Sequence, residues 1–278
     1  MKRMLAAAAV FLTLTGMQAA PGPLPPLSLY RLDCGSFTIN DYNAFFSDTM
    51  AYKPGPKELS SSCYLIRNGD RYLLWDAGLP ERLLGKPEVS PAQTMRLDTT
   101  IVQQLARIGV KPEQINFVGI SHYHLDHLGQ VANFPKAALV IGAGDANWIK
   151  DKPDIYKEEA EALKAWLKGD SRLVAVTSDV DIFRDGRVLM LKLPGHTPGH
   201  SALLVKLASG NVLLSGDLYH FTEQVKNKGV PPFNHDRADT LASMDRFDKL
   251  AANLKAKVII QHEPADIAKL PAFPKAAQ

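Results

Sequence analysis

Apolar and polar residues alternate along the chain in a pattern that predicts strands joined by tight turns. Residues 27–37 fit a first strand, and Asn68-Gly69, Asp185-Gly186 and Ser209-Gly210-Asn211 each stand between two apolar runs. These turn residues adopt the backbone angles that short hairpin loops require. The pattern therefore predicts three hairpins, over residues 63–75, 180–193 and 202–214.

Apolar residues at helical spacing alternate with these hairpins. Helices are predicted over residues 98–108, with Asp98 as the N-cap, over 156–167 and over 236–254. Short strands are predicted over 115–120, which runs directly into His122, and over 257–261. This order of elements favours an α/β fold in which two packed sheets carry helices on their outer faces.

The segment between the first strand and the first hairpin has no clean period. It spans residues 38–60 and contains five large side chains, Tyr42, Phe45, Phe46, Met50 and Tyr52. A loop of this length with so many aromatic residues is predicted to be either a lid or an arm packed on a pocket.

The N-terminus has the layout of a secretory signal peptide. Lys2 and Arg3 precede an apolar run over residues 4–14, and small and turn-forming residues follow up to residue 20. The run is shorter than the ~20 residues of a membrane span. We predict a signal peptide over residues 1–20, a Pro-rich linker over 21–27 and a single domain over 28–278. The mature protein would be periplasmic or secreted, without stable membrane insertion; because Gln18 does not fit the cleavage pattern, an uncleaved anchor is the alternative.

Composition narrows the classes of partner. The chain has 278 residues, 46% of them hydrophobic, and a net charge of +3 that falls to about +1 without Lys2 and Arg3. This is an ordinary globular composition with no basic surface for nucleic acid. A small-molecule partner is therefore expected, and both a monomer and a homodimer remain open.

Two cysteines, Cys34 and Cys63, are present. In an exported protein they could form one disulfide, or they could be two buried thiols. The sequence does not give the Cα separation that decides between these alternatives.

The segment His122-Tyr123-His124-Leu125-Asp126-His127 contains four potential metal ligands in six residues. Side chains at positions i and i+2 of an extended segment point the same way, so His122 and His124 can hold one metal ion together. Asp126 and His127 follow where the chain turns toward a helix and can face the same cavity. The spacing therefore predicts a metal site.

Three further candidate residues lie at the ends of other predicted strands. His200 ends the turn Gly195-His196-Thr197-Pro198-Gly199-His200, Asp217 ends the strand that follows, and His262 ends the last strand. Strands that deliver residues to one edge of a sheet bring these side chains together.

With these motifs the chain resembles the metallo-β-lactamase superfamily. The family's motif His-x-His-x-Asp-His matches residues 122–127, its later ligands match His200, Asp217 and His262, and Trp75-Asp76-Ala77-Gly78 resembles its early Asp-x-Gly turn. The resemblance implies an αββα sandwich of two mixed sheets. It also implies two divalent metal ions, most often Zn²⁺: one held by His122, His124 and His200, the other by Asp126, His127 and His262, with Asp217 between them.

The resemblance also implies a reaction. A hydroxide bridging the two ions would attack a carbonyl or phosphoryl centre, and Asp126 would pass a proton to the leaving oxygen. Asp76 and His196 are candidates to orient the ligands by hydrogen bonds, with plain turn stabilisation as the alternative, and His235 is predicted to be an exposed loop residue.

Within the superfamily the chain resembles N-acyl homoserine lactonases. Asp217 stands where true β-lactamases have Cys or Ser, and only 16 residues follow His262, too few for the C-terminal helices of hydroxyacylglutathione hydrolases. One departure concerns the Tyr that those lactonases place three residues after the bridging Asp. Here that position is His220, and Tyr219 precedes it, so either could contact the substrate carbonyl. The alternatives are a phosphotriester or aryl-ester hydrolase, an iron-dependent sulfur dioxygenase and a metal-binding protein without activity.

Overall fold

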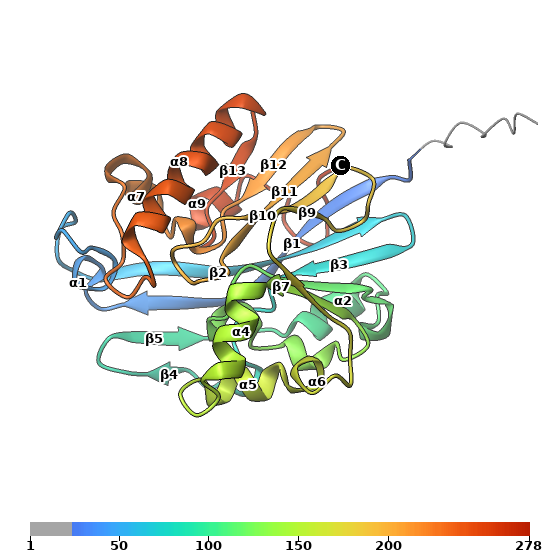
Figure 1. Ribbon diagram of the computed structural model, residues 1–278, viewed down its shortest axis with the longest axis horizontal. Helices are drawn as coiled ribbons and strands as arrows, with labels where there is room; N and C mark the ends of the chain where they lie inside the picture. The colour runs from blue at the N-terminus through green and yellow to red at the C-terminus, as the bar shows by residue number, and fades with distance from the viewer. Residues whose placement is uncertain (1–23) are drawn as a thin grey trace, which may run out of the picture.

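The computed structural model describes residues 24–278, and its centre is two mixed β-sheets packed face to face (Figure 1). The predicted signal peptide over residues 1–20 and the start of the predicted linker lie outside the described residues. In the first sheet the strand order is β4 (Glu88–Val89), β5 (Gln93–Arg96), β1 (Leu27–Ile39), β2 (Lys57–Asn68), β3 (Arg71–Trp75), β6 (Phe117–Ile120), β7 (Ala138–Gly142) and β8 (Leu173–Val176). In the second it is β13 (Lys257–Ile259), β12 (Gly210–Leu214), β11 (Ser201–Leu207), β10 (Val188–Lys192) and β9 (Val180–Asp181).

Helices cover the outer face of each sheet. Figure 1 shows α8 over the second sheet, whereas α4, α5 and α6 lie on the side of the first. No helix among residues 24–278 combines the length and apolar character of a membrane span. The helices are α1 (Tyr42–Phe46), α2 (Ile101–Arg107), α3 (Leu125–Leu128), α4 (Ala143–Asp151), α5 (Lys157–Ala162), α6 (Lys164–Leu167), α7 (Thr222–Asn227), α8 (Arg237–Asn253) and α9 (Pro264–Ile267).

Three apolar layers hold this arrangement together. Trp75 of β3 and Leu203 of β11 belong to one buried cluster between the sheets. Trp166 of α6 is buried in a second cluster against the first sheet, and Phe247 of α8 in a third against the second sheet. Burial of such side chains is the main favourable contribution to folding. The predicted αββα sandwich is confirmed.

Most of the predicted elements are present, but several were missed. The three hairpins form as β2–β3, β9–β10 and β11–β12. Helix α2 begins after Thr100 rather than Asp98, because Thr100 and Gln103 form a reciprocal capping box. The β4–β5 hairpin, β7 and α4, and β8, α7 and α9 were not predicted from the sequence.

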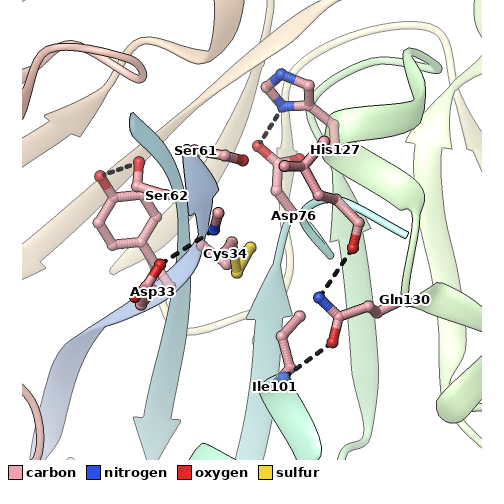
Figure 2. The surroundings of a disulfide bond; sticks show 12 residues. Asp33, Cys34, Ser61, Ser62, Asp76, Ile101, His127 and Gln130 are labelled. Atoms are coloured by element: carbon pink, nitrogen blue, oxygen red, sulfur yellow. Dashed lines mark hydrogen bonds and ion pairs between the residues drawn. A yellow bond between two sulfur atoms is a disulfide. The ribbon is translucent and has the colours of Figure 1, made fainter. Parts of the chain in front are cut away.

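The two cysteines form a disulfide between neighbouring strands of the first sheet. Cys34 of β1 and Cys63 of β2 have Cα atoms 5.8 Å apart, within the range that a disulfide spans. Cys34 lies where the β1–β2 register shifts between Asp33 and Ser36. Figure 2 shows Asp76 and His127 among the residues around the bond, and Leu79, three residues after Asp76, donates a hydrogen bond from its main-chain N to Cys34 O at 3.1 Å.

Removing this disulfide is expected to lower stability without changing the fold. It spans 29 residues, and a cross-link of this length contributes about 3–4 kcal/mol, mainly by restricting the unfolded chain. Urea unfolding of the wild type with and without reductant measures the effect, and a Cys34→Ala/Cys63→Ala variant, which should not respond to reductant, is the control. Identical unfolding midpoints for the wild type under both conditions would contradict the prediction.

Candidate metal centre

Four side chains form a first group of potential metal ligands at the ends of several strands. His122 and His124 follow β6, His196 lies in the turn between β10 and β11, and Asp217 follows β12. The ring atoms His122 Nε2 and His124 Nδ1 lie 3.0 Å apart. His196 Nε2 lies 3.0 Å from His124 Nδ1 and 3.2 Å from His122 Nε2. Three ring nitrogens thus converge on one point.

A second group lies beside the first and contains Asp126, His127, Asp217 and His262. His127 Nε2 lies 3.2 Å from Asp126 Oδ2. The ring atoms His127 Nε2 and His262 Nε2 lie 3.2 and 3.0 Å, respectively, from Asp217 Oδ1. Asp126 and His127 come from α3, whereas His262 follows β13, so both sheets contribute ligands.

Asp217 belongs to both groups and gives one oxygen to each. Its Oδ1 faces the second group, as described above, while its Oδ2 lies 3.6 Å from His196 Nε2 and 3.7 Å from His122 Nε2 in the first. A carboxylate in this position can bridge two cations. The arrangement therefore agrees with the role that the resemblance implied for Asp217.

The ligand assignment of His200 needs correction, because His196 takes its place. His200 lies outside both groups. It ends the hairpin between β10 and β11, where its main chain accepts a hydrogen bond from Leu193 N and its Nδ1 lies 2.8 Å from Leu193 O. These contacts turn the ring of His200 away from the first group and leave its Nε2 buried without a hydrogen-bond partner.

The ring nitrogens of His127 and His262 that face away from the ligand group make hydrogen-bond contacts that orient the rings. Asp76 Oδ2 lies 3.0 Å from His127 Nδ1 (Figure 2), and Asp76 also accepts hydrogen bonds from Ser121 N and Oγ. His262 Nδ1 lies 2.7 Å from Ser60 O of β2. A ring nitrogen that donates in this way leaves the other nitrogen free to bind a metal. The orienting role predicted for Asp76 agrees with this geometry.

Asp145 ties together the two segments that carry the first group, and the sequence analysis missed it. It is fully buried in α4 and accepts hydrogen bonds from Tyr123 N at 3.1 Å, Thr197 Oγ1 at 2.8 Å and Gly199 N at 2.6 Å. Burial raises the pKa of its carboxyl to about 7, although these hydrogen bonds act in the opposite direction. The apolar run of β7 lies just before Asp145 in the sequence. Asp145 could have been found from this run, as Asp217 and His262 were found from the strands that precede them.

The electrostatics of the two groups differ. Burial holds the pKa of His122 and of His196 well below the ordinary value and lowers that of His124 to about 4, so these rings are neutral and can bind a cation. Burial alone would also lower the pKa of His127, but Asp217, Asp126 and Asp76 raise it well above the ordinary value. Likewise burial would raise the pKa of Asp217, but His262 and His127 hold it well below.

The residues present fit two divalent cations. Imidazole nitrogens and carboxylate oxygens without a thiolate suit Zn²⁺, and also Mn, Fe or Co. Two of the converging atoms, His127 Nε2 and Asp217 Oδ1, are buried without a hydrogen-bond partner. Buried polar atoms are rarely left in this state, and a bound cation would satisfy both.

A cavity of about 430 Å³ opens onto the two groups, and its remaining wall is largely apolar. This size fits a small organic molecule. The predicted aromatic arm contributes Phe45 and Phe46 to the wall, whereas Tyr42 and Tyr52 stack on each other outside it. The lining residues are Phe37, Ile39, Phe45, Phe46, Leu59, Leu79, Pro80, Gln93, Met95, His124, Leu125, Asp126, Asp217, His220, Phe233 and His262.

Of the two candidates for substrate contact, only His220 lines the cavity. Its Nε2 lies 3.2 Å from Asp217 Oδ2. Tyr219 points into the core under α8, where its hydroxyl donates to Asp248 at 3.1 Å and accepts from Lys228 at 2.6 Å. The geometry therefore does not support the catalytic role considered for Tyr219. His235 is exposed, as predicted.

Single substitutions of His196 and His200 test which of the two histidines binds metal, because the structure places His196 in the first group and the resemblance implied His200. His196→Ala should reduce bound zinc by about one ion per chain, because it removes one of three converging nitrogens. His200→Gln should retain the zinc of the wild type. Metal analysis after dialysis measures both, with circular dichroism to verify folding. Zinc loss in His200→Gln but not in His196→Ala would restore the original assignment.

Comparison with known proteins supports the same family. N-acyl homoserine lactonase AttM of Azorhizobium caulinodans is 30% identical over 175 residues, which span 61% of this chain and 66%, just under two thirds, of that relative. A solved N-acyl homoserine lactone hydrolase, with N-hexanoyl-L-homoserine bound at its catalytic metal centre, has a TM-score of 0.75 at 22% identity and covers 91% of this chain and 100% of its own. AidC, a dizinc quorum-quenching lactonase, has a TM-score of 0.65 at 17% identity and covers 91% and 90%, respectively.

The model of the metallo-β-lactamase superfamily matches residues 56–262, most of the chain and every ligand of both groups. Together with two mixed sheets between helices and the convergence of five histidines and two aspartates at one edge, this match defines the family. The chain belongs to the metallo-β-lactamase superfamily.

Proposed function

We propose that this protein is a dinuclear, metal-dependent hydrolase that opens the lactone ring of N-acyl homoserine lactones. The observation that carries the proposal is the position of Asp217, which gives one oxygen to each ligand group at the base of a largely apolar cavity. The lactonases named among the relatives and structural neighbours support the same choice of substrate.

The cavity matches the two parts of such a substrate. The polar lactone would lie over Asp217, His220 and His262, and the acyl chain would contact the apolar wall formed by Phe46 and Phe233. When bound, two divalent cations would supply the Lewis acidity that polarises a carbonyl and lowers the pKa of water.

Two side chains of the cavity are assigned to the substrate itself. Gln224 Oε1 accepts a hydrogen bond from His220 N at 2.7 Å and lies 3.2 Å from His220 Nδ1, which directs Nε2 into the cavity, where it would contact the lactone. Asp126 is 21% exposed and lies in the cavity wall as well as in the second group. It is therefore suited to take a proton from the attacking water and to pass it to the ring oxygen as the C–O bond breaks.

We further propose that the metal is zinc and that the protein is exported to the periplasm or secreted. The donor set of nitrogen and carboxylate supports zinc, and one structural neighbour is described as a dizinc lactonase. The Cys34–Cys63 disulfide supports a periplasmic or secreted location, because such bonds persist in oxidising compartments.

The direct test is titration of the acid released when zinc-loaded protein opens N-acyl homoserine lactones in a pH-stat. Paraoxon and p-nitrophenyl acetate serve as the phosphotriester and aryl-ester comparisons. We expect lactone turnover to exceed both and to be lost on chelation. Faster nitrophenol release than lactone opening would support the alternative hydrolase instead, and one bound iron with oxygen uptake would support the sulfur dioxygenase.

A pair of substitutions tests the contact with the lactone. His220→Ala should lower kcat for lactone opening by roughly 100-fold, the scale of one lost transition-state contact. Tyr219→Phe should leave kcat unchanged and reduce stability by about 1 kcal/mol, because it removes only hydrogen bonds to Asp248 and Lys228. Steady-state kinetics and thermal unfolding measure the two effects; the reverse pattern in kcat would reject His220.

A further inference from the structure

Asn234 contacts a ligand ring from a loop that contains none of the metal motifs. The loop, residues 231–236, is the second part of the connection between α7 and α8. His196 is 1% exposed, and its Nδ1 lies 2.8 Å from Asn234 Oδ1. The other nitrogen of the ring, Nε2, is the atom that faces His122 and His124. The contact with Asn234 therefore lies on the opposite edge of the imidazole from the first ligand group.

The hydrogen bonds around Asn234 run in one direction. Thr240 Oγ1 donates its proton to Asp236 O at 2.6 Å, so it can only accept the hydrogen bond from Asn234 Nδ2 at 3.1 Å. The amide nitrogen of Asn234 is thereby held toward Thr240, and the amide oxygen is left facing His196. An oxygen at this position requires a proton on Nδ1, which leaves Nε2 with a free lone pair.

From this geometry we propose that Asn234 is a positioning residue that selects the tautomer of His196 and so directs Nε2 to the first metal ion. The inference rests on the proposed metal centre, but not on the identity of the substrate. The 231–236 loop would then contribute to metal binding, although it contains no metal ligand.

The main chain holds this loop firmly against the turn that carries His196. His235 N donates to His196 O at 3.0 Å, and Asp236 N donates to Gly195 O at 2.9 Å. A Cβ atom at residue 195 would lie 2.2 Å from Thr240 N, so only glycine permits this approach. The distance from Asn234 to His196 is therefore fixed by the backbone on both sides.

The same loop also forms part of the cavity wall. Phe233 lines the cavity, and its ring centroid lies 5.8 Å from that of His196. Two adjacent residues of the loop thus have different contacts: Phe233 lines the cavity, and Asn234 contacts Nδ1 of His196. By contrast, the Nδ1 atoms of His127 and His262 contact Asp76 and Ser60 O, next to β3 and within β2.

The experiment compares zinc affinity and histidine tautomers in the full chain. Asn234→Leu removes the acceptor at nearly constant volume, whereas Asn234→Asp keeps an oxygen facing His196. Asn211→Leu is the matched control, because Asn211 is also half-buried and donates one hydrogen bond, to Leu254 O at 2.8 Å, away from the site. Competition with a chromophoric chelator gives the affinity for each of the two ions, and long-range ¹H–¹⁵N spectra of histidine-labelled protein give the tautomers.

We expect Asn234→Leu to weaken binding of one zinc ion by 10- to 100-fold, a typical effect of losing such a partner, with loss of the His196 Nδ1–H signal. Asn234→Asp and Asn211→Leu should bind both ions as the wild type does. If Asn234→Leu does not fold, Asn234→Ala replaces it.

Unchanged affinity and tautomer in the folded Asn234→Leu or Asn234→Ala variant would overturn the inference, as would an equal loss of affinity in Asn234→Asp. Either outcome would leave the proposed function intact, because the wild type would still bind two ions. Wild-type protein that binds no zinc would overturn the proposed function and the inference together.

Discussion

The carboxylate of Asp217 is the group on which the rest of the site depends. It is 4% exposed and lies between two sets of imidazoles, with one oxygen toward each. A buried carboxylate is unfavourable by several kcal/mol unless cations or hydrogen-bond donors surround it, yet its Oδ1 has no hydrogen-bond partner. The surrounding histidines lower its pKa, and two bound cations would complete this compensation.

The fold makes this arrangement possible because strands of both sheets end at a common edge. The segment after β6 supplies His122 and His124, the turn before β11 supplies His196, and His262 follows β13. Asp145 and Asp76 then connect these segments below the ligands by hydrogen bonds to main-chain and ring atoms. The disulfide between β1 and β2 is connected to the segment that carries Asp76, because Cys34 O accepts a hydrogen bond from Leu79 N.

The fold and most of the ligands could be predicted from the sequence because they follow from short segments of the chain. The motif at residues 122–127 places four ligands by strand and helix periodicity alone, and Asp217 and His262 were found from the strands before them. The choice between His196 and His200 could not be made this way. Both lie in one turn, and the hydrogen bonds between His200 and Leu193, the residue directly after β10, determine which ring faces the metal group.

Two other features depend on contacts that are distant in sequence. Tyr219 and His220 are adjacent, and only the packing of Tyr219 against Asp248 of α8 shows which side chain faces the cavity. Asn234 lies in a loop of irregular pattern, and its role follows from its contact with His196, 38 residues earlier in the chain. Local patterns identify ligands, whereas the orientation of each ligand is determined by tertiary structure.

The central claim is that Asp217 lies between two metal ions, and anomalous diffraction at the zinc absorption edge from crystals of the zinc-loaded protein tests it most directly. The account predicts two anomalous peaks, one on each side of the Asp217 carboxylate, with His122, His124 and His196 around the first and Asp126, His127 and His262 around the second. A single peak, or peaks away from Asp217, would contradict it.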